Sequence, residues 1–225
     1  MSEDEWFARD WPNAMFGVVS ATPAGKDANR LRRFGCAVCS RLDWLLTDQL
    51  RDAIALAEAA ANGTATDRQL RDRAQSLREL TSARALMGSR SRAVEAISHL
   101  LDGSTGAAAA SARAAGAADG RPLDAECAGL LRCVFGNPFR PVRAELPDEW
   151  RTETVVALAH EMYESRDFGA MPVLGDALQD AGCDDDAVLS HCRDERTRGD
   201  ERTVGTHQAI HNRGCWVVDL VLGKK

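Results

Sequence analysis

The sequence has few aromatic residues, little lysine and no long apolar segment. Aromatic side chains make up 5% of the 225 residues, and arginines far outnumber the three lysines. The longest uncharged stretch near the amino terminus, residues 11–25, holds two prolines and is too short for a membrane-spanning helix. We therefore expect no insertion into a membrane, and the shortage of aromatic residues disfavours a fold rich in strands.

A signal for export is also missing. Residues 1–5 contain three acids, whereas a secretory signal needs a basic stretch followed by an apolar one. Seven cysteines in such a chain predict reduced thiols, and an odd number cannot all pair within one molecule. We therefore expect a cytoplasmic protein. The net charge of -6 disfavours binding to nucleic acid or to an anionic membrane surface.

The common catalytic motifs are missing too. The sequence contains no G-x-S-x-G nucleophile elbow and neither G-x-x-x-x-G-K-[ST] nor G-x-G-x-x-G, the loops that bind phosphates. Lys26 is the only lysine before the carboxy terminus, which excludes a P-loop nucleotide enzyme. We therefore assign no catalytic residue, and an enzyme with an unrecognised site is kept as an alternative.

What the chain does contain is alanine, at 37 positions, and apolar residues at helical spacing. A stripe from Leu31 to Leu45 illustrates the pattern, and Thr66 with Gln69 fits a capping box that would start a helix at Asp67. The fold class predicted is an all-α array of about seven to nine helices. The expected helices span residues 29–46, 48–61, 67–87, 90–101, 123–134, 154–166, 172–181 and 185–193.

Residues 103–121 interrupt this pattern. They are rich in alanine, glycine and serine and carry no large apolar side chain, which predicts a linker or a loosely packed loop that is at most transiently helical around residues 107–115. We therefore expect an amino-terminal helical region, 1–102, and a carboxy-terminal one, 122–225, either as separate domains or sharing one core. The apolar ending, residues 215–223, is ambiguous between a short helix and an extended segment.

Several segments of the chain resemble a known family. They include LRRFGCAVC at 31–39, GNPFRP at 136–141 and RGCWVVD at 213–219. These segments resemble an uncharacterised bacterial family that occurs as many paralogues in some large genomes. The resemblance covers nearly the whole chain except the alanine-rich segment and the charged segment after Arg193, which is longer here than the family pattern. It implies membership only, because the family brings no established activity, cofactor or catalytic residue.

Cysteine and histidine spacing suggests a metal site. A C-x2-C pair and an H-x3-C pair have spacings at which thiolates and imidazoles can close a tetrahedral zinc shell. The candidate ligands are Cys36, Cys39, His211 and Cys215, with His191 and Cys192 as alternates. The first pair lies inside an expected helix, and cysteine often packs as a small apolar residue. Buried thiols that bind no metal are therefore favoured over a structural zinc ion.

The GNPFRP segment is the most distinctive loop. Phe139 and Arg140, flanked by prolines, could form a rigid recognition surface, since prolines reduce the entropy lost on binding. The alternative, which we favour, is that Phe139 fills the core and the prolines reverse the chain.

Taken as a whole, the sequence favours a non-catalytic helical module that binds an unknown protein partner or regulates one. A zinc-stabilised structural protein is the first alternative, and the enzyme named above is the second.

Overall fold

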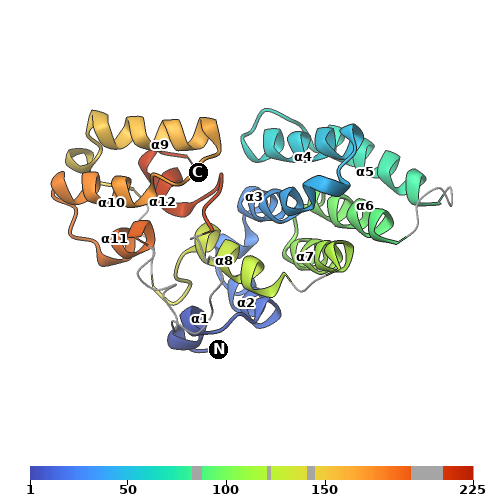
Figure 1. The fold of residues 1–225 in the computed structure, drawn as a ribbon, viewed down its shortest axis with the longest axis horizontal. Coiled ribbons are helices and arrows are strands. Elements are labelled where there is room, and N and C mark those ends of the chain that lie inside the picture. Colours follow the sequence, from blue (N-terminus) through green and yellow to red (C-terminus); the bar gives the residue numbers. More distant parts are fainter. Residues whose placement is uncertain (83–87, 121–122, 141–144, 194–209, 225) are drawn as a thin grey trace. The chain divides into compact units, whose positions relative to one another are not determined.

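The computed structural model describes residues 1–82, 88–120, 123–140, 145–193 and 210–224. Within these ranges the chain forms twelve α-helices and three short 3-10 helices, with no strand (Figure 1). The predicted all-α class is confirmed, with more helices than expected, because several short or alanine-rich helices lack the apolar stripe used to predict the others. None of the described helices is long and apolar enough to cross a membrane.

The chain divides into two compact units. Unit 1 comprises Met1 and residues 10–131, and unit 2 comprises residues 2–9 and 132–225. The boundary lies inside helix α8 (Asp124–Phe135) and not at residues 103–121, where the sequence analysis expects a linker. The amino-terminal residues belong to unit 2 because the Arg132 guanidinium donates to the carbonyls of Trp6, at 2.9 Å, and Arg9, at 2.7 Å.

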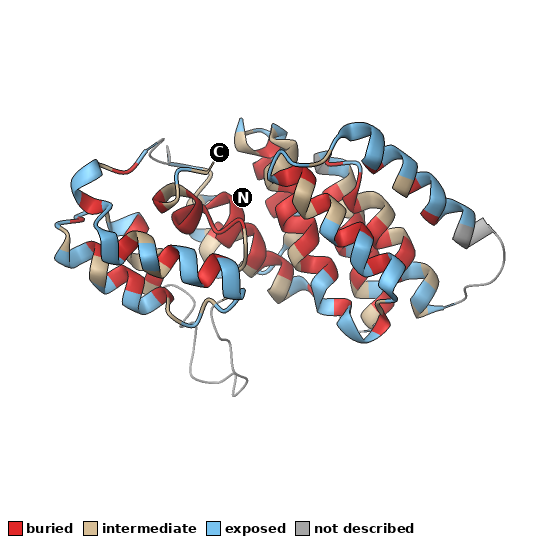
Figure 2. Cartoon of the chain, turned by 90° about the horizontal axis from the view of Figure 1, so that it is seen from above, coloured by how far each residue is buried: buried red, intermediate tan, exposed pale blue. Residues whose placement is uncertain are grey.

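Unit 1 is built around one central helix. Its elements are α2 (Pro12–Ser20), η1 (Ala24–Lys26), α3 (Ala28–Cys39), η2 (Ser40–Leu45), α4 (Asp48–Ala61), α5 (Asp67–Ser82), α6 (Ser89–Leu100), α7 (Thr105–Asp119) and most of α8. Helix α3 packs against α4, α6 and α7, and its predicted stripe, including Leu31 and Phe34, is buried. Figure 2 shows the buried residues gathered on the facing sides of these helices.

Unit 2 is built from shorter helices. They are α1 (Glu3–Ala8), the end of α8, η3 (Asp148–Trp150), α9 (Glu153–Ser165), α10 (Met171–Asp180), α11 (Asp186–Arg193) and α12 (Trp216–Val221). The ambiguous carboxy-terminal segment is therefore helical, and Trp216, Val217 and Val221 on it are buried. Gly136, at φ +64°, lies against the Trp216 ring, since a Cβ there would be 3.4 Å from three ring atoms.

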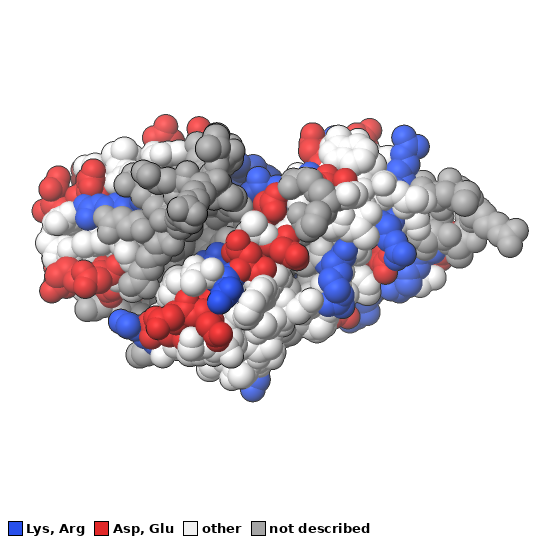
Figure 3. Space-filling view, turned by 60° about the horizontal axis from the view of Figure 1, so that its bottom comes forward, with Lys and Arg blue, Asp and Glu red and all other residues white. Residues whose placement is uncertain are grey.

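The two units differ in charge. Acidic side chains outnumber basic ones in unit 2, whereas the two signs are almost balanced in unit 1. On the face drawn in Figure 3, acidic side chains gather on unit 2, and side chains of both signs lie on unit 1. The net negative charge of the chain therefore resides in unit 2.

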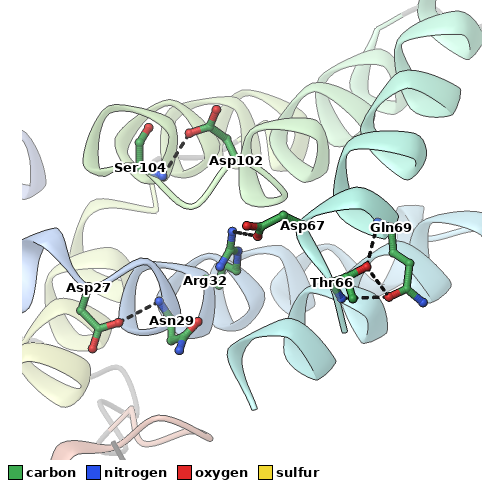
Figure 4. Close-up of polar contacts among 8 residues, drawn as sticks. All are labelled: Asp27, Asn29, Arg32, Thr66, Asp67, Gln69, Asp102 and Ser104. Atoms are coloured by element: carbon green, nitrogen blue, oxygen red, sulfur yellow. Dashed lines mark hydrogen bonds and ion pairs between the residues drawn. The ribbon is translucent and has the colours of Figure 1, made fainter. Parts of the chain in front are cut away.

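Polar caps fix the helix starts of unit 1 (Figure 4). The capping box is confirmed: the Thr66 backbone N–H donates to Gln69 Oε1 at 2.8 Å, and the Gln69 N–H donates to Thr66 Oγ1 at 3.3 Å. The Asp27 carboxylate accepts from the Asn29 N–H at the start of α3. The side chain of Arg32, one turn further on, is almost buried and forms an ion pair with Asp67 at 3.8 Å.

The clearest difference from the sequence analysis is helix α7, which occupies most of the expected linker. Ala112 and Ala115 are buried, and the fully buried Ser111 hydroxyl donates to the Ala96 carbonyl at 2.8 Å. Ser104 caps the helix by accepting from the Ala107 N–H. The prediction of a loosely packed loop was wrong because alanine allows helices to approach closely, so α7 packs on α3 and α6 without large side chains.

Candidate metal centre

Four side chains from separate parts of unit 2 converge on one point. Cys133 lies in the last turn of α8, His191 in the last turn of α11, and His211 and Cys215 in the segment that leads into α12. One ligand atom of each, the sulfur of the cysteines and a ring nitrogen of the histidines, lies within 4.8 Å of all the others. Both thiols are buried and both imidazoles are partly exposed.

The distances suit a tetrahedral ion. His191 Nε2 lies 3.2 Å from Cys215 Sγ, and His211 Nδ1 lies 3.8 Å from Cys133 Sγ and 3.9 Å from Cys215 Sγ. With Zn–S bonds of about 2.3 Å and Zn–N bonds of about 2.0 Å, nitrogen and sulfur donors of a tetrahedral site lie about 3.5 Å apart. Small side-chain rotations would therefore bring the four donors into zinc geometry.

The ligand segments are held by the core and by hydrogen bonds. On α11, Val188 is buried in the core of unit 2, and on α12 Val217 is buried there too. Between them, the Arg213 guanidinium donates to the Tyr163 carbonyl on α9 at 2.6 Å. The Cys215 N–H donates to the Asn212 carbonyl, which closes the turn between the two ligands of the H-x3-C pair.

The two thiols of the centre have opposite pKa shifts. Burial, followed by a hydrogen bond to Cys215, raises the pKa of Cys133 well above its ordinary value. Burial also acts to raise the pKa of Cys215. The hydrogen bond from Cys133 and the interactions with His191 and His211 outweigh it and hold that pKa well below the ordinary value. The two imidazoles and the Cys133 thiol therefore favour the thiolate form of Cys215, the form that binds metal ions.

Aromatic rings cover one side of the group. The His191 ring centroid lies 4.9 Å from that of His211 and 5.3 Å from that of Trp216. The His211 Nε2 atom is buried and makes no hydrogen bond with the described part of the chain. Coordination through His211 Nδ1 would leave this nitrogen protonated, so the ring would present one defined atom to the ion.

The structure brings together three of the six candidate ligands named from the sequence. His191, His211 and Cys215 belong to the group, which also includes Cys133, a residue that the sequence analysis does not select. Cys133 has no ligand close to it in sequence, so no spacing rule could find it. Its only local signal is its place at the end of an apolar helix.

The other three candidates lie in different surroundings. Cys36 and Cys39 are on α3 of unit 1, where the Cys36 thiol donates to the Ile54 carbonyl and Cys39 Sγ lies 3.5 Å from Ser111 Oγ. Cys192 is buried in the core of unit 2, where a Cβ on Gly175 of α10 would lie 2.9 Å from its own Cβ. All seven cysteines are buried, and none forms a disulfide.

The candidate recognition loop is partly exposed. Phe139 is 40% exposed, so it does not fill the core as the favoured interpretation expects. Its N–H donates to the Asn137 side-chain oxygen at 3.0 Å. Asn137 and Arg140 both bind the Glu3 carboxylate, at 2.7 and 2.6 Å, which ties this loop to α1 within unit 2.

Comparisons with protein-family models, with curated protein sequences and with solved structures found no match to this chain. The resemblance of its segments to a bacterial paralogous family therefore stays a prediction, and the geometry of the four-residue group is the basis for a functional proposal.

Proposed function

We propose that this chain is a non-catalytic helical protein whose unit 2 is stabilised by a structural zinc ion bound to Cys133, His191, His211 and Cys215. The observation that carries the proposal is the convergence of four soft donor atoms within 4.8 Å of one another. The ligand set differs from the one expected from the sequence, in that Cys133 and the alternate His191 replace the Cys36–Cys39 pair.

The chemistry of the donors favours zinc. Two thiolates and two imidazoles with tetrahedral spacing are a common set for structural zinc, whereas magnesium and calcium prefer oxygen donors. Two thiolates also neutralise a divalent ion, so the complete centre would carry no net charge. A neutral centre avoids the large cost of burying an unpaired charge beside the core.

Four protein donors also favour a structural role over a catalytic one. A catalytic zinc ion keeps one coordination position for water or substrate, and a closed set of four protein ligands leaves none. The ion would cross-link the end of α8, the end of α11 and the start of α12, which are otherwise joined by a long stretch of chain. We therefore propose that the zinc ion stabilises unit 2 by cross-linking its short helices.

Metal analysis of the purified protein tests this proposal. We expect about one zinc ion per chain, and we expect Cys133→Ser and His211→Ala variants to lose it. Cobalt substitution should give the absorption bands of a tetrahedral thiolate site. The matched control is Cys36→Ser, which removes an equally buried thiol from unit 1 and should keep the metal. Zinc that is lost in Cys36→Ser and kept in Cys133→Ser would overturn the ligand assignment.

A role in binding a protein partner is a second proposal, supported by the exposure of Phe139. An aromatic side chain that is 40% exposed contributes less to folding than a buried one. We therefore expect Phe139→Ala to leave the midpoint of thermal unfolding nearly unchanged. A large drop in that midpoint would show that Phe139 is a core residue and would remove it as a partner contact.

A further inference from the structure

The two sulfurs of the metal centre lie beside each other. Cys133 Sγ and Cys215 Sγ belong to the donor atoms that lie within 4.8 Å of one another, and the two thiols share a hydrogen bond. Cys133 lies in the last turn of α8, and Cys215 directly precedes α12. A disulfide needs its sulfurs about 2 Å apart, so rotation of the two side chains towards each other would bring them together. These cysteines are therefore placed to pair with each other as well as with a metal ion.

The group is in contact with solvent on one side. Both sulfurs are buried, whereas the imidazoles of His191 and His211 are partly exposed. The exposed His191 ring leads directly to a sulfur, since its Nε2 atom lies 3.2 Å from Cys215 Sγ. A small uncharged oxidant such as hydrogen peroxide, which is little larger than water, can approach the sulfurs from the histidine side.

Cys192 is the competing partner for Cys215. It is buried in the same core and lies near enough to Cys215 for the two thiols to interact electrostatically. Its side chain packs against α10, where a Cβ on Gly175 would lie 2.9 Å from its own Cβ. It is also absent from the group of four donor atoms, which includes Cys133. Cys133 is therefore the favoured partner of Cys215.

We propose that Cys133 and Cys215 form a redox-sensitive pair, which hydrogen peroxide converts into a disulfide with release of the zinc ion. The release of zinc rests on the proposed function, whereas the disulfide depends on the two cysteines alone. A disulfide has no thiolate left to offer a metal ion, and the two imidazoles that remain are half of a closed zinc shell.

The oxidation consists of two displacement steps. The Cys215 thiolate attacks one oxygen of the peroxide, so that an S–O bond forms, the O–O bond breaks and the leaving hydroxide takes a proton from solvent. The Cys133 thiolate then attacks the sulfur of the Cys215 sulfenic acid. An S–S bond forms, the S–O bond breaks and the second hydroxide takes a proton. The two thiolates lose two electrons in total, and the peroxide is reduced to two molecules of water.

Oxidation would change which helices of unit 2 are tied together. The zinc ion would link the end of α8, the end of α11 and the start of α12, whereas the disulfide links only α8 and α12. His191 on α11 would lose its bond to the centre. Hydrogen exchange should therefore become faster in α11 and stay slow at the start of α12, whereas removal of zinc without oxidation should loosen both.

Peptide mapping of the full-length, zinc-loaded protein tests the proposal. After treatment with hydrogen peroxide, we expect mass spectrometry to find a Cys133–Cys215 cross-link. A chromogenic chelator should detect about one zinc ion released per disulfide, and dithiothreitol followed by added zinc should restore the centre. Cys36 and Cys39 are the control within the same molecule. They are equally buried on α3 of unit 1, away from the imidazoles, and should stay reduced.

A matched variant checks the choice of partner. Cys192→Ser removes a buried thiol from the same core and should keep both the Cys133–Cys215 disulfide and the release of zinc. A disulfide between Cys192 and Cys215 in the wild type would overturn the proposal. So would two reduced cysteines at a peroxide concentration that fully oxidises glutathione in the same sample. If the purified protein holds no zinc, the proposed function fails, and the peptide map still decides whether the pair forms a disulfide.

Discussion

Unit 1 and unit 2 use the same residue, cysteine, in opposite ways. In unit 1 the Cys39 thiol is enclosed by the core, and burial raises its pKa to about 12 even though Ser111 bonds to it. In unit 2 the Cys215 thiol is just as buried, yet Cys133, His191 and His211 hold its pKa well below the ordinary value. Burial alone therefore does not fix the pKa of a thiol. The two thiols differ because the Cys215 sulfur has a second thiol, Cys133, and two imidazoles beside it.

The units also differ in how they hold their helices together. Unit 1 packs α3, α4, α6 and α7 along much of their lengths, so its stability can come from helix contacts alone. Unit 2 contains helices as short as six residues, α1 and α12, which gain little from helix propensity. If zinc is bound, unit 2 should depend on it and unit 1 should not.

Removing the metal should have the largest effect. Structural zinc contributes about 10–16 kcal/mol of apparent binding free energy in zinc-finger peptides, so a chelator should unfold or loosen unit 2. Hydrogen exchange should become much faster in α11 and α12 and stay slow in α3 and α6. Adding zinc back is the control and should restore protection. Equal acceleration of hydrogen exchange in both units, or no acceleration in either, would contradict the prediction that only unit 2 depends on zinc.

A core truncation in unit 1 should have the next largest effect. Phe34 is fully buried, and its ring contacts Phe16 edge to face at 5.3 Å between centroids. Phe34→Ala should lower the free energy of unfolding of unit 1 by about 3–5 kcal/mol, measured by urea denaturation. Phe34→Leu should lower this free energy of unfolding by a smaller amount, and both variants should keep their zinc. A loss of metal in Phe34→Ala would show that the two units do not fold independently.

Alkaline pH should weaken unit 1 through its buried thiols. Cys39 and Cys127 each have a pKa raised from 9.0 to about 12, with burial as the largest cause. Their stabilising effect is complete below pH 9 and is lost as the pH rises towards 12, because only the unfolded thiols ionise in that range. Each thiol should reduce the free energy of unfolding by about 1.4 kcal/mol per pH unit there.

The matching control is a Cys39→Ala variant, whose stability should fall less steeply above pH 9 than that of the wild type. Identical slopes for the two proteins, measured by urea denaturation at several pH values, would show that this thiol is not the group that titrates.

Most of the helices could be predicted because their signals are local. The apolar stripe around Phe34 and the capping box at Thr66 depend only on residues a few positions apart, and α3 and α5 begin where these signals indicate. The short helices α1 and α2 carry no long stripe, so the sequence analysis does not predict them. Helix α7 is missed for a different reason, because its packing depends on small side chains that also occur in linkers.

The candidate site was only partly predictable, because only part of its signal is local in the sequence. The H-x3-C spacing of His211 and Cys215 is local and marks them as a pair. Cys133 joins them only through the folding of unit 2, since it lies 78 residues before His211. The C-x2-C spacing of Cys36 and Cys39 is just as local, but a spacing cannot tell whether its thiols will meet imidazoles or a hydrocarbon core.

The smallest expected effect comes from removing the N-cap of α7, the helix that the sequence analysis does not predict. The Ser104 hydroxyl accepts from the Ala107 N–H at 3.1 Å and so satisfies one exposed donor at the start of α7. Ser104→Ala should lower the free energy of unfolding of unit 1 by about 1 kcal/mol, and Ser104→Asp should restore most of it. Both are measurable by urea denaturation with metal content unchanged. If residues 105–119 were the loose linker that their composition suggests, removing this cap would not change the free energy of unfolding. A measurable loss of stability in Ser104→Ala that Ser104→Asp reverses therefore distinguishes a packed alanine helix from a linker.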